Sequence, residues 1–388
     1  MKKIMVATLL GLFAVASFGG VSLEEAMAAS AKDGKPVMVD FYADWCGPCK
    51  LFTRESKTKK DIKAALGKVH LVKLDAEKGG KEIAEKYSIK GYPTFVFMDS
   101  KGQSFYRFWG YDREYFLENF NKALADQTTY AARIKRYAAK KGMEDGMALA
   151  NYYNTRGDSQ KTVALYEEIL KNYPKAPVMY DLFEAKFADM GKDASKYPAL
   201  AELAKNVLAS ESADASKKVA VAEMMLSAAK RVEKVDSAGH FLEAGIKSAK
   251  AAKDEKHMDT RLKRLQSAHA LHIAKDEAAA VSFYKASLQE GWMEDANQLN
   301  AFSWWCFQNK VNLREGRTLA KKGIELAEDK SDKANIIDTL AEIENAMGNP
   351  IEAARLMEEA IKLDDREAFK KQLERFRKLA SESAGSGR

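Results

Sequence analysis

The sequence predicts an α/β domain followed by an all-α helical-repeat region. Two short apolar runs in the first third of the chain, residues 36–43 and 94–99, are typical of buried β-strands. From about residue 127 proline becomes sparse, strand-like runs disappear, and Ala, Lys, Glu and Leu recur with helical periodicity. A chain of 388 residues is long enough for about two or three domains, so we expect each region to bury its own core.

The most informative motif is Cys46-Gly47-Pro48-Cys49, which follows the run 36–43 and precedes a helical pattern. The cysteines therefore lie at a predicted strand-to-helix junction, where Pro48 fits the first turn because its missing N–H costs nothing there. Cys46 then faces the unpaired N–H groups and the positive dipole end of the helix, which stabilise a thiolate. We expect Cys46 to attack a substrate disulfide and Cys49 to resolve the mixed disulfide.

A second motif, Gly91-Tyr92-Pro93-Thr94, stands directly before the apolar run 94–99. A proline at the start of a strand indicates a constrained turn, and the bond before Pro93 is a candidate for the cis form. Beside the cysteine pair, this turn strengthens the redox interpretation.

With these motifs the chain resembles the thioredoxin family over roughly residues 23–126. The residues that carry the resemblance are WCGPCK, Asp40 on the preceding strand, Lys73 within LVKLDAE, the GYPT turn, and Gly110 after SFYRFW. The resemblance implies a thioredoxin-like domain, with a mixed sheet flanked by helices. It also implies that redox-active thiols act without a cofactor.

The resemblance also implies roles for individual residues. Asp40 and Lys73 would be a buried pair that manages the proton on Cys49. Pro93 would be a cis-proline beside the dithiol, where an extended substrate segment pairs with the backbone. The residues expected at the substrate groove are Trp45, Gly47, Pro48, Tyr92, Pro93 and Gly110.

Spacing alone leaves two of these roles open. Met38, Asp40 and Tyr42 share one side of the predicted strand, and that side is either solvated or buried. Burial would raise the pKa of Asp40 and suit it to proton transfer. Lys73 by itself is typical of a surface lysine. Residues 23–34 look helical and no clear strand precedes them, so the edge of the sheet is also open.

A structural zinc site and a static disulfide are the other interpretations of the cysteine pair. Zinc needs two more Cys or His ligands, and the sequence offers one distant cysteine, Cys306, and five scattered histidines. His257, His269 and His272 lie on predicted helices without a completing set, so we expect no metal. A disulfide that closes so short a loop constrains the unfolded chain little, which favours redox activity. We expect Cys306, with aromatic neighbours on both sides, to be buried.

The N-terminus predicts export. Lys2 and Lys3 precede an uncharged apolar run over residues 4–18, and small residues follow, which is the pattern of a secretory signal peptide over residues 1–22. We expect cleavage and a periplasmic or secreted protein of a bacterium. The alternative is an uncleaved anchor, because the uncharged stretch to Leu23 is just long enough to span a bilayer. After cleavage we expect no membrane span.

The helical region over residues 127–380 resembles tetratricopeptide repeats in its spacing. A concave face of such an array can hold an extended peptide, so we expect it to bind a substrate or partner protein. The small polar segment 381–388 predicts a disordered tail. The repeat positions on which this prediction rests are Leu149, Ala150, Tyr153, Tyr166, Ala268, Leu271, Ala280, Tyr284, Trp304, Phe307, Ala320, Gly323, Ile337, Leu340, Ala341, Ala353, Met357 and Ala360.

The net charge of +7 is spread along the chain, which argues against nucleic acid as a partner. Two hypotheses follow. The first is an exported thiol–disulfide oxidoreductase that reduces disulfide-containing proteins, with a membrane thiol protein as its electron donor, since the Gly-Pro dipeptide resembles that of reducing thioredoxins. The second is a protein-binding scaffold or envelope assembly factor whose redox domain is secondary.

Overall fold

The computed structural model describes residues 21–255 and 257–385, and these residues form two compact units. The first unit extends to Asp189 and the second begins at Met190. The signal segment predicted over residues 1–22 lies outside the described residues except for its last two.

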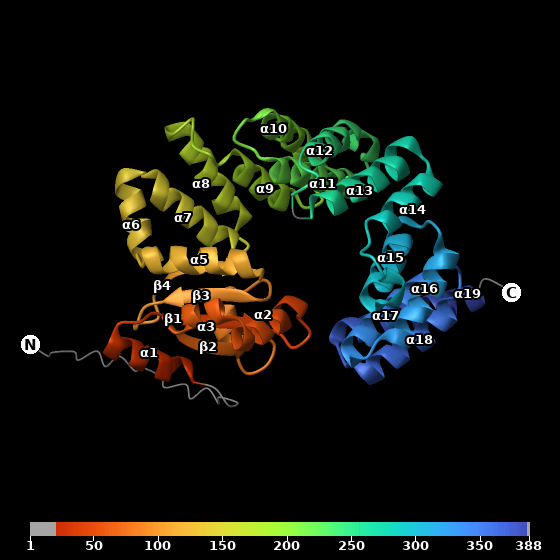
Figure 1. Ribbon diagram of the computed structural model, residues 1–388, viewed down its shortest axis with the longest axis horizontal. Helices are drawn as coiled ribbons and strands as arrows, with labels where there is room; N and C mark the ends of the chain where they lie inside the picture. Colours follow the sequence, from red (N-terminus) through yellow and green to blue (C-terminus); the bar gives the residue numbers. More distant parts are fainter. Residues whose placement is uncertain (1–20, 256, 386–388) are drawn as a thin grey trace, which may run out of the picture. The chain divides into compact units, whose positions relative to one another are not determined.

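The first unit contains a four-stranded mixed sheet, which confirms the predicted α/β class (Figure 1). Its order is β2-β1-β3-β4, in which β1 pairs parallel with β2 and antiparallel with β3, and β3 pairs antiparallel with β4. The register places Asp40 opposite Lys73. The strands are β1 (Val37–Tyr42), β2 (His70–Asp75), β3 (Thr94–Met98) and β4 (Ser104–Trp109).

Helices cover both faces of this sheet, so its central strands are buried on both sides. One face carries a phenylalanine-rich core with side chains from α2, α3 and α5, and the other packs against α1 and α4. Helix α1 confirms the helix expected over residues 23–34, and Ser22 caps it reciprocally with Glu25. The bounds are α1 (Leu23–Asp33), α2 (Gly47–Thr58), α3 (Lys60–Leu66), α4 (Lys81–Lys86) and α5 (Arg113–Ala125).

The first four helices of the helical region belong to the same compact unit as the sheet. They are α6 (Tyr130–Lys140), α7 (Met143–Asn154), α8 (Ser159–Asn172) and α9 (Met179–Met190), and only the last residue of α9 lies beyond Asp189. The side chain of Asn151 donates to the backbone oxygen of Arg107 on β4 over 3.2 Å. Polar contacts therefore join this part of the helical region to the sheet edge, beyond the boundary expected at residues 126–127.

The second unit is helical throughout its described residues, as predicted. Its α-helices are α10 (Tyr197–Ala209), α11 (Ala215–Arg231), α12 (Gly239–Ala251), α13 (Met258–His269), α14 (Glu277–Ala286), α15 (Ala296–Asn309), α16 (Leu313–Leu326), α17 (Lys330–Ala346), α18 (Pro350–Leu363) and α19 (Glu367–Gly385). Short 3₁₀ segments at Val235–Ala238 and Trp292–Glu294 and a π-helical turn at Ala270–Ala274 lie between them, and a 3₁₀ turn at Ala194–Lys196 precedes α10.

Consecutive helices of this unit pack through the small and apolar positions that the spacing singled out. Ile337 and Leu340 on α17 share a core with Met357 on α18. Gly348, with φ of 89°, lies in the turn between these helices and takes a backbone conformation that favours glycine. The assignment to tetratricopeptide repeats stays a prediction.

Two further predictions concern single segments of the second unit. The side chain of Cys306 on α15 is fully buried, as expected. Helix α19 continues to Gly385, so residues 381–385 are helical where the composition predicts a disordered tail. The physical reason is that extending a helix that is already formed costs little, and Ala, Glu and Ser are all compatible with an α-helix.

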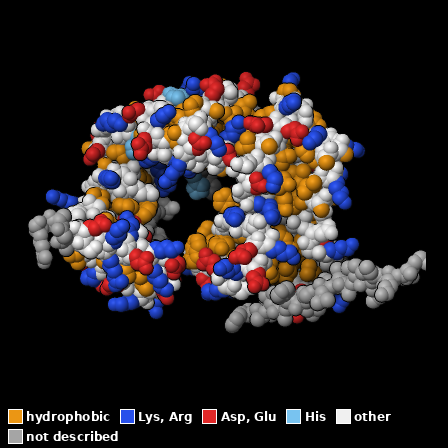
Figure 2. Space-filling view, turned by 180° about the vertical axis from the view of Figure 1, so that it is seen from behind, with side chains coloured by type: hydrophobic (Ala, Val, Ile, Leu, Met, Phe, Trp, Pro, Cys, Tyr) orange, Lys and Arg blue, Asp and Glu red, His pale blue; other side chains and the backbone are white. Residues whose placement is uncertain are grey.

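The surface carries both signs of charge side by side on the face drawn in Figure 2, as the sequence composition indicates. Within residues 21–255 and 257–385, no helix combines the length and the apolar content that crossing a membrane requires.

The contact between α11 and α12 generates a stability prediction. A Cβ atom at Gly245 would lie 2.5 Å from the Cβ of Ala222, whereas one at Gly239, on the same helix, would meet its nearest atom at 3.7 Å. We expect Gly245→Ala to destabilise the protein by about 1–3 kcal/mol through overpacking, and Gly239→Ala to have little effect. Urea unfolding followed by circular dichroism measures both. Equal unfolding midpoints for the two variants would contradict the close packing of these helices.

Candidate active site

Cys46 and Cys49 form a disulfide at the start of α2. Cys46 is the N-cap residue, and its Sγ accepts the backbone N–H of Cys49 over 3.2 Å. Pro48 lies in the first turn, where the predicted junction placed it. Both cysteines are buried in this oxidised form, so exposure does not distinguish them. The position of Cys46 as N-cap residue does distinguish it from Cys49, because the N–H groups at the helix start favour negative charge on its sulfur.

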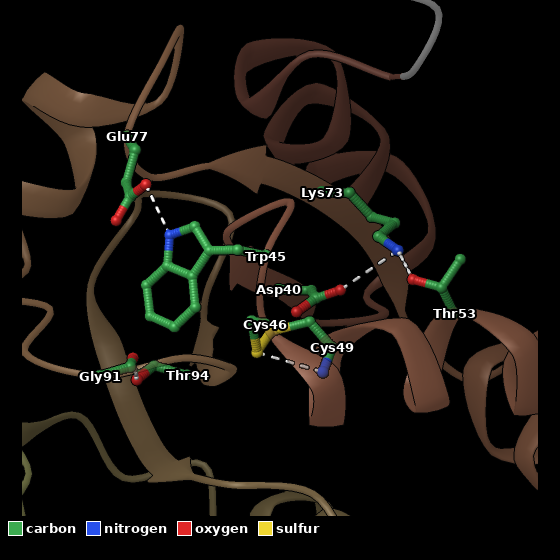
Figure 3. Close-up of a disulfide and its surroundings, with 9 residues drawn as sticks. All are labelled: Asp40, Trp45, Cys46, Cys49, Thr53, Lys73, Glu77, Gly91 and Thr94. Carbon is green, nitrogen blue, oxygen red and sulfur yellow. Dashed lines mark hydrogen bonds and ion pairs between the residues drawn. A yellow bond between two sulfur atoms is a disulfide. The ribbon is translucent and has the colours of Figure 1, made fainter. Parts of the chain in front are cut away.

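Asp40 lies on β1, on the strand that leads into the disulfide, and only 1% of it is exposed. Its Oδ2 is 3.5 Å from Nζ of Lys73 on β2, and its Oδ1 has no hydrogen-bond partner within the described part of the chain. Burial raises the pKa of Asp40 to about 6, and the nearby charge of Lys73 opposes that rise. Lys73 Nζ also donates to Thr53 Oγ1 over 2.7 Å, which holds the ammonium beside α2. Figure 3 shows this pair together with the disulfide.

Two aromatic side chains lie near the disulfide. Tyr92 packs against the buried cluster of Ala43, Cys46 and Cys49, and its ring lies edge-on to the ring of Trp45 with 6.0 Å between centroids. Trp45 is 46% exposed, and its Nε1 donates to Glu77 Oε2 over 2.9 Å (Figure 3). An exposed indole with a fixed orientation offers apolar area and one anchored edge beside the dithiol.

The GYPT turn meets the end of β4. The Tyr92–Pro93 peptide bond is cis, the form that the family resemblance implies. Thr94 Oγ1 donates to the backbone oxygen of Gly91 over 2.7 Å, and the N–H of Gly110 donates to the oxygen of Pro93 over 2.8 Å. Pro93 and Gly110, which are 17 positions apart in the chain, are therefore brought together by the pairing of β3 with β4.

Three residues near the site were not among the candidates from the sequence. Glu77 orients Trp45 and Thr53 holds Lys73, as described above. Trp109, the last residue of β4, is 59% exposed, and a Cβ atom at Gly91 would lie 3.6 Å from its ring. Single exposed aromatic residues are common on protein surfaces, so the sequence carries no signal that would have singled out Trp109. Glu77 and Thr53 likewise carry no such signal.

The third cysteine and the histidines form no comparable centre. Burial raises the pKa of the Cys306 thiol to about 12, so it stays protonated and unreactive at neutral pH. Burial lowers the pKa of His272 to about 4, while His269 is 3.8 Å from Glu243. Among the described residues, no group of three or more His, Cys, Asp or Glu side chains is placed to hold a metal ion.

Comparison with known proteins identifies relatives of the first part of the chain. Residues 20–100 match a family model described as thioredoxin-like. The thiol:disulfide interchange protein DsbD of Ralstonia nicotianae is 37% identical over 107 residues, which are 26% of this chain and 18% of that protein. Thioredoxin Y2 of Arabidopsis thaliana chloroplasts is 49% identical over 72 residues, 17% of this chain and 39% of that protein.

Thioredoxin-1 of Drosophila melanogaster is 41% identical over 68 residues, which are 18% of this chain and 61% of that protein. The chain thus spans less than two thirds of each of these three relatives, and less than a fifth of the DsbD protein of Ralstonia nicotianae.

The buried carboxyl of Asp40 generates a pH prediction. Its folded pKa of about 6 is above the ordinary value of 3.8, so the folded state binds this proton more tightly than the unfolded state does. Stability is therefore lost as the pH rises from 4 to 6, by about 3 kcal/mol for this group. We expect Asp40→Asn to be more stable than the unaltered oxidised protein by up to that amount at pH 7.5, and equal to it near pH 3.5.

Urea unfolding of both proteins across this pH range measures the difference. Glu24→Gln, on the surface of α1, is the matched control and should follow the unaltered protein. A difference between Asp40→Asn and the unaltered protein that does not change with pH would show that the carboxyl is not held neutral by burial.

Proposed function

The N-terminal part of this chain is a thioredoxin-like domain, and on that premise we propose that the protein is an exported thiol–disulfide oxidoreductase that reduces protein disulfides. The observation that carries the proposal is the Cys46–Cys49 disulfide at the start of α2, with the Asp40–Lys73 pair in the adjoining interior and the cis Tyr92–Pro93 turn nearby. The helical region would bind the substrate or a partner protein.

In the proposed reaction, the Cys46 thiolate attacks one sulfur of a substrate disulfide. An intermolecular S–S bond forms and the other substrate sulfur leaves as a thiolate. Cys49 then attacks the Sγ of Cys46, which releases the second substrate sulfur. The substrate gains two electrons and two protons in all, and the Cys46–Cys49 disulfide is restored.

Asp40 suits the second step of this reaction. Cys49 must lose its proton before it attacks, and a carboxylate whose pKa lies near 6 is a usable base at neutral pH. The Lys73 ammonium, 3.5 Å away, stabilises the carboxylate before the proton arrives. After turnover the same proton is available to the leaving thiolate.

The substrate groove in this proposal lies beside the cis turn. Gly47 and Pro48 are exposed at the start of α2, and Trp45 and Tyr92 border them. The carbonyl of Pro93 is occupied by Gly110, so an extended substrate would pair with other backbone groups of the turn. Trp109 adds exposed apolar area next to Gly91.

The direction and compartment rest on the sequence. The Gly-Pro dipeptide favours reduction, and the signal pattern over residues 1–22 favours export to the periplasm or beyond. A reductase in an oxidising compartment needs a source of electrons, and we propose a membrane thiol protein for this role. The similarity to a protein named for thiol:disulfide interchange supports the thiol–disulfide exchange chemistry of this proposal.

A groove of about 310 Å³ between α6, α7 and α8 supports the proposed role of the helical region. Its lining is largely apolar and aromatic, with Ile134, Tyr137 and Tyr153 among the residues, and it also includes the charged side chains of Lys141, Lys161 and Glu168. A surface of this kind suits a peptide segment with large side chains. The same groove favours the second candidate function, a protein-binding scaffold whose redox domain is secondary.

A trapping experiment separates the two functions. We expect Cys49→Ser to accumulate mixed disulfides with partner proteins through Cys46, because the resolving thiol is gone, and dithiothreitol to release them. The Cys46→Ser/Cys49→Ser variant is the control and should capture none covalently. Partners retained equally by both variants would favour the scaffold. Stronger trapping by Cys46→Ser alone would reverse the roles of the two cysteines.

The reduction potential tests the direction. Equilibration of the Cys46–Cys49 pair with glutathione buffers should give a value near that of thioredoxin, about −270 mV. A value near that of a strong oxidant such as DsbA, about −120 mV, would contradict the reductase assignment.

A further inference from the structure

Arg107 is a buried arginine without a carboxylate partner among the described residues. It lies in the middle of β4, and only 1% of it is exposed. Its guanidinium donates instead to three backbone oxygens: Nη1 to Tyr87 over 2.7 Å, and Nη2 to Thr155 over 3.0 Å and to Ser88 over 3.4 Å. Burial lowers its pKa to about 10, so it is still a cation at neutral pH. A charge is costly to bury, and here backbone dipoles alone compensate it.

One of these oxygens belongs to the end of helix α7. Thr155 is the C-cap of α7, so its carbonyl is among the last of the helix, where the dipole is negative and the oxygens lack helical partners. The contact is reciprocal, because Asn151 on α7 donates to the backbone oxygen of Arg107. Helix α7 and strand β4 are therefore joined in both directions.

The other two oxygens begin the segment that ends at the cis turn. Tyr87 follows α4, and Ser88 has a φ of 51°, in the left-handed region. Arg156, just after α7, donates Nη1 to the same Tyr87 oxygen over 3.4 Å. A Cβ atom at Gly157 would lie 3.4 Å from the side chain of Lys90. The turn between α7 and α8 thus lies against the segment 87–90.

The segment 87–93 is short and leads directly to the disulfide. Its far end is Tyr92 and Pro93, and Tyr92 packs against the buried cluster that contains both cysteines. Tyr92 lies five positions after Tyr87 in the chain, and the N–H of the intervening Ile89 donates to the oxygen of Ala84 on α4. A short stretch of backbone thus connects the Tyr87 and Ser88 carbonyls to the Tyr92 side of the dithiol.

We propose that Arg107 is a positioning residue that holds the segment 87–93 against the end of α7, so that the helical region sets the Tyr92 side of the substrate groove. The inference rests on the proposed function for the existence of that groove. The helical region then acts on specificity through the site itself, in addition to any partner that it binds. The reaction with a small disulfide does not need the groove, so its rate constant does not depend on Arg107.

Stopped-flow kinetics of the reduced protein tests this separation. We expect Arg107→Met to lower the second-order rate constant with insulin by about tenfold or more, the loss that one hydrogen bond to a charged group would give. The rate constant with 5,5′-dithiobis(2-nitrobenzoic acid) should stay within about twofold, since that small disulfide meets only the Cys46 thiolate. Arg156→Ala, which removes a weaker bond to the same carbonyl, should give a smaller loss in the same direction and remain folded.

Arg133→Met is the matched control. Arg133, like Arg107, is a buried arginine, and it lies on α6 of the helical region. It pairs with Asp126 and Asp145 over 2.5 and 3.0 Å and does not contact the segment 87–93. We expect Arg133→Met to leave the ratio of the two rate constants, with insulin and with the small disulfide, unchanged. Equal losses with insulin and with the small disulfide in Arg107→Met and Arg156→Ala, or no loss in either variant, would overturn the proposal.

Hydrogen–deuterium exchange of the oxidised protein tests the same inference without turnover. In Arg107→Met and in Arg156→Ala, the amides of residues 88–92 should exchange faster while those of β1 do not change. Unchanged exchange at residues 88–92 would overturn the positioning role. If the unaltered protein reduced neither disulfide while exchange responded as expected, the proposed function would fail and the positioning of the segment would stand.

Discussion

Strand β1 is buried on both faces, and the chemistry of the site depends on this burial. Helices α2, α3 and α5 cover the face that carries Met38, while α1 and α4 cover the face that carries Val37 and Val39. The side chain of Asp40 is therefore almost fully removed from water, with only 1% of it exposed. Its raised pKa and its pairing with Lys73 follow from that position. The same strand delivers the chain to the start of α2, where the two cysteines lie.

The site places its two negative groups in different environments. The N–H groups at the start of α2 would stabilise a Cys46 thiolate. Desolvation, in contrast, disfavours the Asp40 carboxylate and raises the pKa of Asp40. In the proposed reaction, these two opposite effects would allow Cys46 to act as the nucleophile and Asp40 to carry a proton at the same pH.

Buried arginines in the first unit are compensated in two ways. Arg133 has two carboxylates, Asp126 and Asp145, which neutralise it where α5 ends and α6 and α7 begin. Arg107 has only carbonyl oxygens, from the turn after α4 and from the end of α7. The partners of Arg107 are backbone oxygens, so Arg107 joins backbone segments to each other. The partners of Arg133 are side-chain carboxylates. The boundary between the sheet and the helical region is for this reason a continuous polar contact.

The sequence by itself determined the order of the elements around the cysteines. Alternating and helical periodicities locate β1, α2 and β3, and the CGPC motif places the cysteines at their junction, because these signals depend only on neighbouring residues. It also indicated the helical region and the burial of Cys306. It did not determine the face of Asp40, since alternation assigns a side to a residue but does not say what covers that side.

The tertiary structure decided which distant residues meet. Glu77 with Trp45, Thr53 with Lys73, and Gly110 with Pro93 are brought together by strand pairing and helix placement, which no local pattern encodes. It also decided that α6–α9 belong with the sheet. A single arginine in a strand is typical of a solvent-facing position. In the folded protein Arg107 is buried, and its charge meets three carbonyl oxygens, two from the turn after α4 and one from the end of α7. The physical reason is that desolvation is a property of the assembled fold, to which every covering element contributes.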